Sequence, residues 1–92
     1  MAVDVSKVPS TPGVYKFFSN HEIIYIGKAK NLKKRVSSYF GKSIKDRKTS
    51  QIKFLRDNIE TFTTKNEVEA LLLEQMLIKE NKPKFNILLR DD

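Results

Sequence analysis

Two β-prone runs joined by three turn-forming residues constrain the fold of this chain most strongly. The runs cover residues 13–18 (GVYKFF) and 22–26 (EIIYI), and residues 19–21 (SNH) lie between them. Because β-branched and aromatic residues favour strands and the intervening residues favour turns, we predict a β-hairpin. Gly27 is expected to end the second strand.

Helical periodicity follows the hairpin. Asn31 is a suitable N-cap for a helix over residues 32–40, in which the apolar side chains recur at i, i+4, i+7 and i+8, and Gly41 is expected to end it. Residues 42–48 are basic and polar and predict an exposed loop. A second helix is predicted over residues 49–58, and a short β-branched strand over residues 59–64.

The strongest helix signal lies in the second half of the chain. Asn66 followed three residues later by Glu69 is a capping-box pattern, which opens a helix that runs to about residue 79 or 80. The pair Lys82-Pro83 breaks the pattern, and residues 85–89 are expected to form an extended or short helical tail. Mixed strands and helices in 92 residues predict one α+β domain spanning residues 1–92.

The charge of the chain is unevenly distributed. The net charge is +7, and residues 28–56 hold eleven bases and one acid, whereas residues 57–80 hold six acids and two bases. A basic segment of this kind is typical of a surface that binds a nucleic-acid backbone, although a solvated lysine-rich face has the same composition. The residues expected to contact DNA are Lys30, Lys33, Lys34, Lys45, Arg47 and Lys48.

Composition excludes several other classes of protein. The chain has no cysteine, so disulfide frameworks and thiolate zinc sites are excluded. The sequence shows neither a secretion signal nor eighteen consecutive apolar residues, so we expect a cytoplasmic protein without membrane contact. The one histidine, His21, lies in the predicted turn and is expected at the surface. There is no Ser-His-Asp set and no phosphate-binding glycine loop.

Glu74 is the most informative charged residue. On a helix its neighbours at three and four residues are Ala70, Leu71, Leu77 and Ile78, all apolar, so its carboxylate is expected at a buried face. An unpaired charge there would cost several kcal/mol. Glu74 should therefore face a cation, which is either an arginine or lysine of the chain or a bound metal ion.

Four residues of the first half complete the candidate site. Tyr15 and Tyr25 are ten residues apart on the two strands, which is compatible with a register that pairs them across one face, although a lone strand tyrosine usually only packs. Lys28 is expected directly after the second strand. Arg35 borders the apolar stripe of the first helix, where it could extend along the surface or hold a phosphate.

The tripeptides Gly13-Val14-Tyr15 and Tyr25-Ile26-Gly27 resemble the two halves of the signature of the GIY-YIG nuclease family, with Val in place of Ile in the first. The likeness extends from Pro12 almost to the end of the chain. It is greatest to the UvrC branch of the family, the incision subunits of bacterial nucleotide excision repair. Its further landmarks are the segments 28–35, 37–40, 67–74 and 84–92.

This resemblance implies a three-stranded antiparallel sheet flanked by helices and a metal-dependent endonuclease that leaves a 5′-phosphate and a 3′-hydroxyl. It implies that Glu74 is the single protein ligand of one Mg²⁺ or Mn²⁺ ion. It also implies a 3′-side incision on damaged DNA held by UvrB. The residues that it places around the ion are Tyr15, Tyr25, Lys28, Arg35, Tyr39 and Asn86.

The expected mechanism has Tyr25, or less readily Tyr15, accepting a proton from the attacking water, with Lys28 favouring the phenolate and Arg35 binding the phosphate. Two alternatives remain. One is a stand-alone repair or mobile-element nuclease, and the other is a non-catalytic basic module that binds DNA or RNA and in which Glu74 pairs with Arg35. UvrC-like chains continue beyond the segment that matches residues 89–92, so we expect an excised N-terminal domain. We expect the isolated domain to be a monomer with little base specificity.

Overall fold

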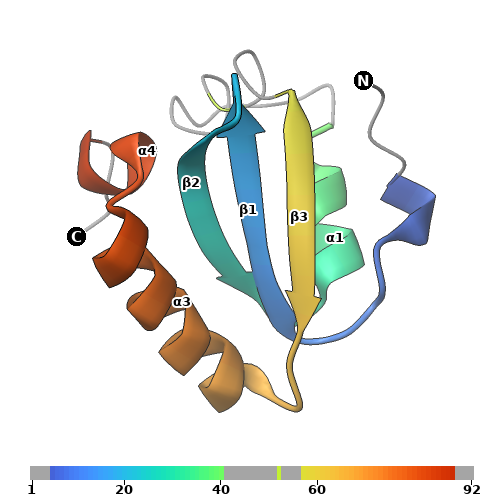
Figure 1. Cartoon of the computed structure of the whole chain (residues 1–92). Coiled ribbons are helices and arrows are strands. Elements are labelled where there is room, and N and C mark those ends of the chain that lie inside the picture. The colour runs from blue at the N-terminus through green and yellow to red at the C-terminus, as the bar shows by residue number, and fades with distance from the viewer. Residues whose placement is uncertain (1–4, 41–51, 53–56, 89–92) are drawn as a thin grey trace.

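A small antiparallel sheet with helices on both faces forms the fold of this chain, seen here in a computed structural model (Figure 1). The structure describes residues 5–40, 52 and 57–88. The strand order is β2-β1-β3, with β1 pairing antiparallel to both neighbours. The elements in chain order are η1 (Val5–Lys7), β1 (Gly13–Ser19), β2 (Glu22–Ala29), α1 (Leu32–Ser38), β3 (Asn58–Thr63), α3 (Glu67–Asn81) and α4 (Lys84–Leu88). The predicted α+β class and three-stranded sheet are confirmed.

The predicted hairpin is present as β1 and β2. Asn20 and His21 form its two-residue turn, and both have positive φ angles, 51° and 68°, as the turns that match the strand twist require. The register pairs Tyr15 with Gly27 and Phe17 with Tyr25. Tyr15 and Tyr25 therefore share a face of the sheet as diagonal neighbours and are not directly opposite each other.

Gly27 does not end the second strand, as the sequence had led us to expect. The strand β2 continues to Ala29, so Lys28 lies inside it, opposite Val14. A β-carbon on Gly27 would lie closer than van der Waals contact to Cζ and the hydroxyl oxygen of Tyr15. The glycine is thus needed for the close approach of a ring across the strand pair.

One face of the sheet packs against α1. The core on this side contains Tyr15, Phe17, Leu32 and Val36, all fully buried. Asn31 caps α1 as predicted, since its side chain accepts a hydrogen bond from the backbone N–H of Lys34 at 3.0 Å. The helix ends at Ser38, earlier than predicted, and Gly41 lies outside the described residues.

The second predicted helix lies largely outside the described residues, as does the predicted loop over residues 42–48. Ile52 is helical and fully buried. Asn58, the expected last residue of that helix, instead begins β3. The strand predicted over residues 59–64 is confirmed with a shift of one residue.

The other face of the sheet packs against α3. Val14 and Ile26 of the sheet contact Ala70 of the helix in a second apolar cluster. Asn66 caps α3 by accepting from the backbone N–H of Glu69 at 2.8 Å. The reciprocal bond of the predicted capping box is shifted, because Glu69 accepts from the N–H of Lys65 at 3.3 Å.

The helix α3 runs to Asn81, slightly beyond its predicted end, and Lys82 closes it in the left-handed conformation at φ 45°. The short helix α4 follows at the edge of β2, in agreement with the predicted tail (Figure 1). Within the described part of the chain, none of the helices combines the length and the apolar character that a membrane crossing requires.

Candidate active site

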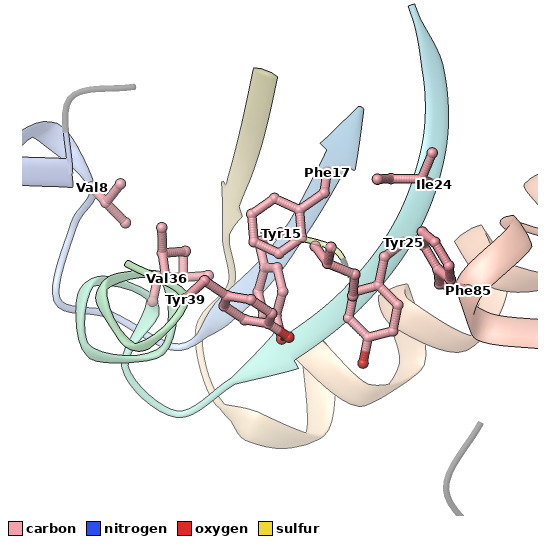
Figure 2. Close-up of a cluster of buried hydrophobic side chains, with 10 residues drawn as sticks. Val8, Tyr15, Phe17, Ile24, Tyr25, Val36, Tyr39 and Phe85 are labelled. Atoms are coloured by element: carbon pink, nitrogen blue, oxygen red, sulfur yellow. The ribbon is translucent and has the colours of Figure 1, made fainter. Parts of the chain in front are cut away.

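Three tyrosines gather on the α1 side of the sheet. Their rings come from β1, from β2 and from the C-cap residue that follows α1, and their hydroxyl groups point to the same side of the cluster (Figure 2). The hydroxyl oxygens of Tyr15 and Tyr39 are 3.2 Å apart, and the ring centroids of Tyr15 and Tyr25 are 6.2 Å apart. The exposed fractions are 1% for Tyr15, 8% for Tyr25 and 0% for Tyr39. The expected site tyrosines therefore form one buried group.

Arg35 is bound to this group. Its Nε donates a hydrogen bond to the hydroxyl oxygen of Tyr15 at 3.2 Å, and its Nη2 donates to that of Tyr39 at 3.4 Å. The guanidinium also lies 5.1 Å from the centroid of the Tyr39 ring, within the range of a cation–π interaction. These contacts fix the orientation of a planar group that binds phosphate oxygens well.

Burial sets the ionisation of two of the phenols. Removal from water raises the pKa of the Tyr15 hydroxyl, and the neighbouring Tyr25 adds to the effect. Removal from water likewise raises the pKa of the Tyr39 hydroxyl, with a further contribution from Tyr15. Arg35 opposes both shifts without reversing them. Tyr15 and Tyr39 are therefore protonated at neutral pH.

The charge of Arg35 is secured by the same contacts. Burial disfavours the protonated guanidinium, but the interactions with the phenols of Tyr15 and Tyr39 outweigh this effect, and the pKa of Arg35 is raised. The arginine is thus a permanent positive charge at the edge of the tyrosine group.

Asn86 lies at the outer edge of β2. Its Oδ1 accepts a hydrogen bond from the backbone N–H of Ile26 at 2.8 Å, and its Nδ2 donates to the carbonyl oxygen of Ile26 at 2.8 Å. Ile26 is the residue between Tyr25 and Gly27. The side-chain amide therefore makes the two hydrogen bonds that a further strand would make with this edge of β2, next to the site residue Tyr25.

A cleft of about 470 Å³ adjoins Arg35 between α1 and the beginning of α3. Its described lining holds four cationic side chains, and all four belong to the expected site residues. Lys33 is not part of its lining, and Lys45, Arg47 and Lys48 lie outside the described residues. The lining residues are Lys28, Ala29, Lys30, Asn31, Lys34, Arg35, Ser38, Glu67 and Ala70.

Lys28 belongs to this cleft and not to the face that carries Tyr25. The two residues are three positions apart on β2, and successive side chains of a strand leave opposite faces. The expected effect of Lys28 on the phenol of Tyr25 therefore has no support from the register. Its placement beside Arg35 favours contact with an anion in the cleft.

Glu74 follows Ala70 by one turn of α3, which places it on the helix face that packs against the sheet. It is half-buried, and Leu71 beside it is exposed, so the apolar surroundings are less complete than the sequence had indicated. Its Oε1 accepts a hydrogen bond from the side-chain amide of Gln75 at 3.1 Å.

The expected cation partner of Glu74 is not a basic side chain of the described residues. The alternative pair with Arg35 is absent from this part of the chain, because Arg35 is directed at the tyrosine hydroxyls. The described residues also contain no group of three or more histidine, cysteine or acidic side chains that could hold a metal. Among the residues that the structure describes, Glu74 is thus a carboxylate without a positive partner, and its hard oxygen atoms suit Mg²⁺ or Mn²⁺.

Sequence reasoning missed one acidic residue of the site. Glu67 lines the cleft and pairs with Lys30 at 3.7 Å between carboxylate and ammonium. Its position seven residues before Glu74 indicates that both lie on one face of α3. That spacing was visible in the sequence and could have singled out Glu67.

Comparison with known proteins assigns the family. A family model described as the UvrC-like GIY-YIG domain matches residues 11–87. The UvrABC system protein C of Psychrobacter cryohalolentis is 54% identical over 89 residues, and that of Actinobacillus pleuropneumoniae is 52% identical. These matches cover 96% of this chain but only 14% and 15% of the two relatives.

Solved structures agree with the sequence relatives. The GIY-YIG N-terminal endonuclease domain of UvrC from Thermotoga maritima, bound to magnesium as its catalytic divalent cation, is similar with a TM-score of 0.82 and 41% identity. The likeness covers 90% of this chain and 91% of that domain. Variants of the same domain with a tyrosine-to-phenylalanine or an asparagine-to-alanine change give TM-scores of 0.82 and 0.80. This chain therefore belongs to the UvrC-like GIY-YIG domain family.

Proposed function

We propose that this chain is a DNA endonuclease domain that cuts one strand of a duplex. The observation that carries the proposal is the fixed orientation of Arg35, which two buried phenols hold at the edge of a cationic cleft. A rigid planar cation is suited to the charge that develops on a phosphate during hydrolysis. The family assignment supports the same reaction.

Glu74 would hold the one divalent ion, Mg²⁺ or Mn²⁺, that the reaction needs. The fit rests on its carboxylate oxygens and on the lack of a positive partner among the described residues. A single protein ligand leaves most positions of a hard ion open to water and phosphate oxygens. When bound, the ion would stabilise negative charge on the scissile phosphate and its departing 3′ oxygen.

The other site residues would have distinct roles in the reaction. Arg35 would bind the phosphate oxygens, while the protonated phenols of Tyr15 and Tyr39 hold its guanidinium in place. Tyr25 would act as the general base toward the attacking water, whose oxygen bonds to phosphorus as the P–O3′ bond breaks, and the departing 3′ oxygen would take up a proton from solvent. Asn86 would fix the strand segment that carries Tyr25. The products would be a 5′-phosphate and a 3′-hydroxyl.

The biological setting is part of the proposal. The bacterial relatives are named as component C of the UvrABC system, and this chain spans 14–15% of their length. We infer a 3′-side incision in damaged duplex DNA during nucleotide excision repair, with UvrB bound to DNA as the partner. The inferred location is the bacterial cytoplasm, and the isolated domain is inferred to be a monomer.

Nicking of supercoiled plasmid tests the activity. The chain should convert plasmid to the open-circular form only when Mg²⁺ or Mn²⁺ is present. Glu74→Gln should abolish nicking while DNA retention on a filter changes little, and Glu80→Gln, an exposed carboxylate of the same helix, should leave both unchanged. DNA retention by the parent chain with no nicking at any metal concentration would favour the non-catalytic basic module instead.

A further inference from the structure

The cleft beside Arg35 carries more charged groups than the proposed reaction uses. Its lining combines the side chains of Lys28, Lys30, Lys34 and Arg35 with one carboxylate, that of Glu67. A concave surface lined mainly by one sign of charge concentrates ions of the opposite sign. The cleft therefore favours an anion, and under the proposed function the abundant anion is the phosphate of a DNA backbone.

The cleft adjoins the place where the scissile phosphate would bind. Arg35 lines the cleft and also contacts the hydroxyl group of Tyr15. Glu67 and Glu74 are separated by seven residues of α3, which corresponds to about 10 Å along the helix axis. One strand of DNA carries a phosphate about every 3.4 Å along its axis. A strand cut near Arg35 and Glu74 would thus present neighbouring phosphates to the cleft.

Glu67, the one acid among the described residues that line the cleft, forms an ion pair with a lysine. The carboxylate of Glu67 lies 3.7 Å from the ammonium of Lys30, and the two side chains are 56% and 85% exposed. Ion pairs as exposed as this one contribute little to folding stability. The pair does, however, neutralise one of the four cations of the cleft, so its effect on an anionic ligand is larger than its effect on the fold.

We propose that the cleft binds a backbone phosphate next to the scissile one, and that Glu67 competes with this phosphate for Lys30. The inference rests on the proposed DNA substrate and adds a residue that limits its affinity. Glu67 weakens the hold on the strand, which favours release of the cut product. It acts through Lys30 and touches no reacting atom, so it is a positioning residue.

Equilibrium binding without metal tests this inference. The probe is a short fluorescein-labelled duplex, titrated by anisotropy over a series of salt concentrations in EDTA. One added phosphate contact steepens the dependence of log K on log salt by about 0.9, which corresponds to about 3-fold in affinity over a four-fold range of salt. Glu67→Gln should therefore bind tighter with a steeper slope, and its advantage over the parent chain should shrink about 3-fold when the salt concentration is raised four-fold. Lys30→Ala should bind more weakly with a flatter slope.

Glu69→Gln is the matched control, because it removes one charge from the same turn of α3 outside the cleft lining, and glutamine keeps an oxygen for the N–H of Lys65. In a Lys30→Ala background, Glu67→Gln should no longer tighten binding. The inference is overturned if Glu67→Gln gains no more affinity than Glu69→Gln, or if its gain persists without Lys30.

The binding test and the nicking test fail separately. If Glu67→Gln shows the specific gain in affinity but the chain never nicks plasmid, this inference holds and the nuclease proposal is contradicted. If the chain nicks plasmid with metal but Glu67→Gln shows no specific gain in affinity, only the role of Glu67 is contradicted.

Discussion

The side chain of Asn86 is hydrogen-bonded to both backbone polar groups of Ile26, at 2.8 Å each. Ile26 lies on β2, an edge strand, between Tyr25 and Gly27. The two bonds hold in place the strand segment in which Tyr25 contributes its ring to the site and Gly27 allows the ring of Tyr15 to approach. An asparagine sixty positions away in sequence thus determines the shape of the site without belonging to the tyrosine group.

Asn86→Ala is predicted to destabilise the fold. Both partly buried backbone groups of Ile26 would lose their partner, and an unsatisfied group of this kind costs about 1–3 kcal/mol. Urea unfolding followed by circular dichroism measures the loss. Asn81→Ala serves as the control, because it removes only an exposed bond to the carbonyl oxygen of Leu77 and should cost less. Equal losses in the two variants would contradict the role assigned to Asn86.

Gly27→Ala is predicted to be destabilising for a steric reason. The added methyl group would overlap the end of the Tyr15 ring, which is almost fully buried and has little room to move. Overpacking a core typically costs about 1–3 kcal/mol. The free energy of unfolding should fall by that amount in the parent chain and by clearly less in a Tyr15→Ala background. A loss that is the same in both backgrounds would show that the ring is not the obstacle.

The parts of the fold that the sequence predicts correctly depend on neighbours along the chain. Asn31 and Asn66 each cap a helix by accepting from the N–H three residues ahead, so a short pattern is enough to locate both. The hairpin is predicted from the sequence for the same reason, because its two-residue turn at Asn20 and His21 joins two strongly β-prone runs.

The parts that sequence reasoning missed depend on contacts across the fold. Gly27 has the sequence signature of a strand end, yet the ring of Tyr15 on the paired strand explains its presence in mid-strand. Arg35 was expected at the border of the buried stripe of the first helix, but its hydrogen bonds to two phenols from different elements could not be read from the spacing along that helix. Helical spacing relates Glu67 to Glu74, but only the packing of α3 against β2 brings Glu67 to Lys30, which directly follows that strand.

The stability of the fold is predicted to fall at alkaline pH. Burial raises the pKa values of Tyr15 and Tyr39 in the folded state above the value of about 10 for an unfolded chain. Above pH 10 the unfolded state therefore binds fewer protons than the folded state, and stability decreases by about 1.4 kcal/mol per pH unit for each of these phenols. Below pH 10 their contribution is fully present and does not change with pH.

Urea unfolding between pH 9 and pH 11 measures this dependence. Tyr39→Phe should reduce the slope of stability against pH by the contribution of one phenol, because phenylalanine has no proton to lose. An unchanged slope in Tyr39→Phe would mean that this hydroxyl ionises as readily in the folded chain as in the unfolded one, against the burial seen here.

Arg35→Lys is predicted to separate catalysis from binding. Lysine keeps the positive charge of the cleft but lacks the planar fork whose Nε and Nη2 are held by Tyr15 and Tyr39. Removing one preoriented donor of this type from a developing negative charge typically lowers the rate about 10²–10³-fold. Plasmid nicking at saturating protein should fall by that factor while duplex retention stays within about 3-fold, since one phosphate contact is preserved.

Lys34→Arg is the control, because it exchanges the same two residue types at a cleft position outside the tyrosine group and should leave nicking nearly unchanged. If Arg35→Lys nicks as fast as the parent chain, the orientation of the guanidinium by the two phenols has no part in the reaction.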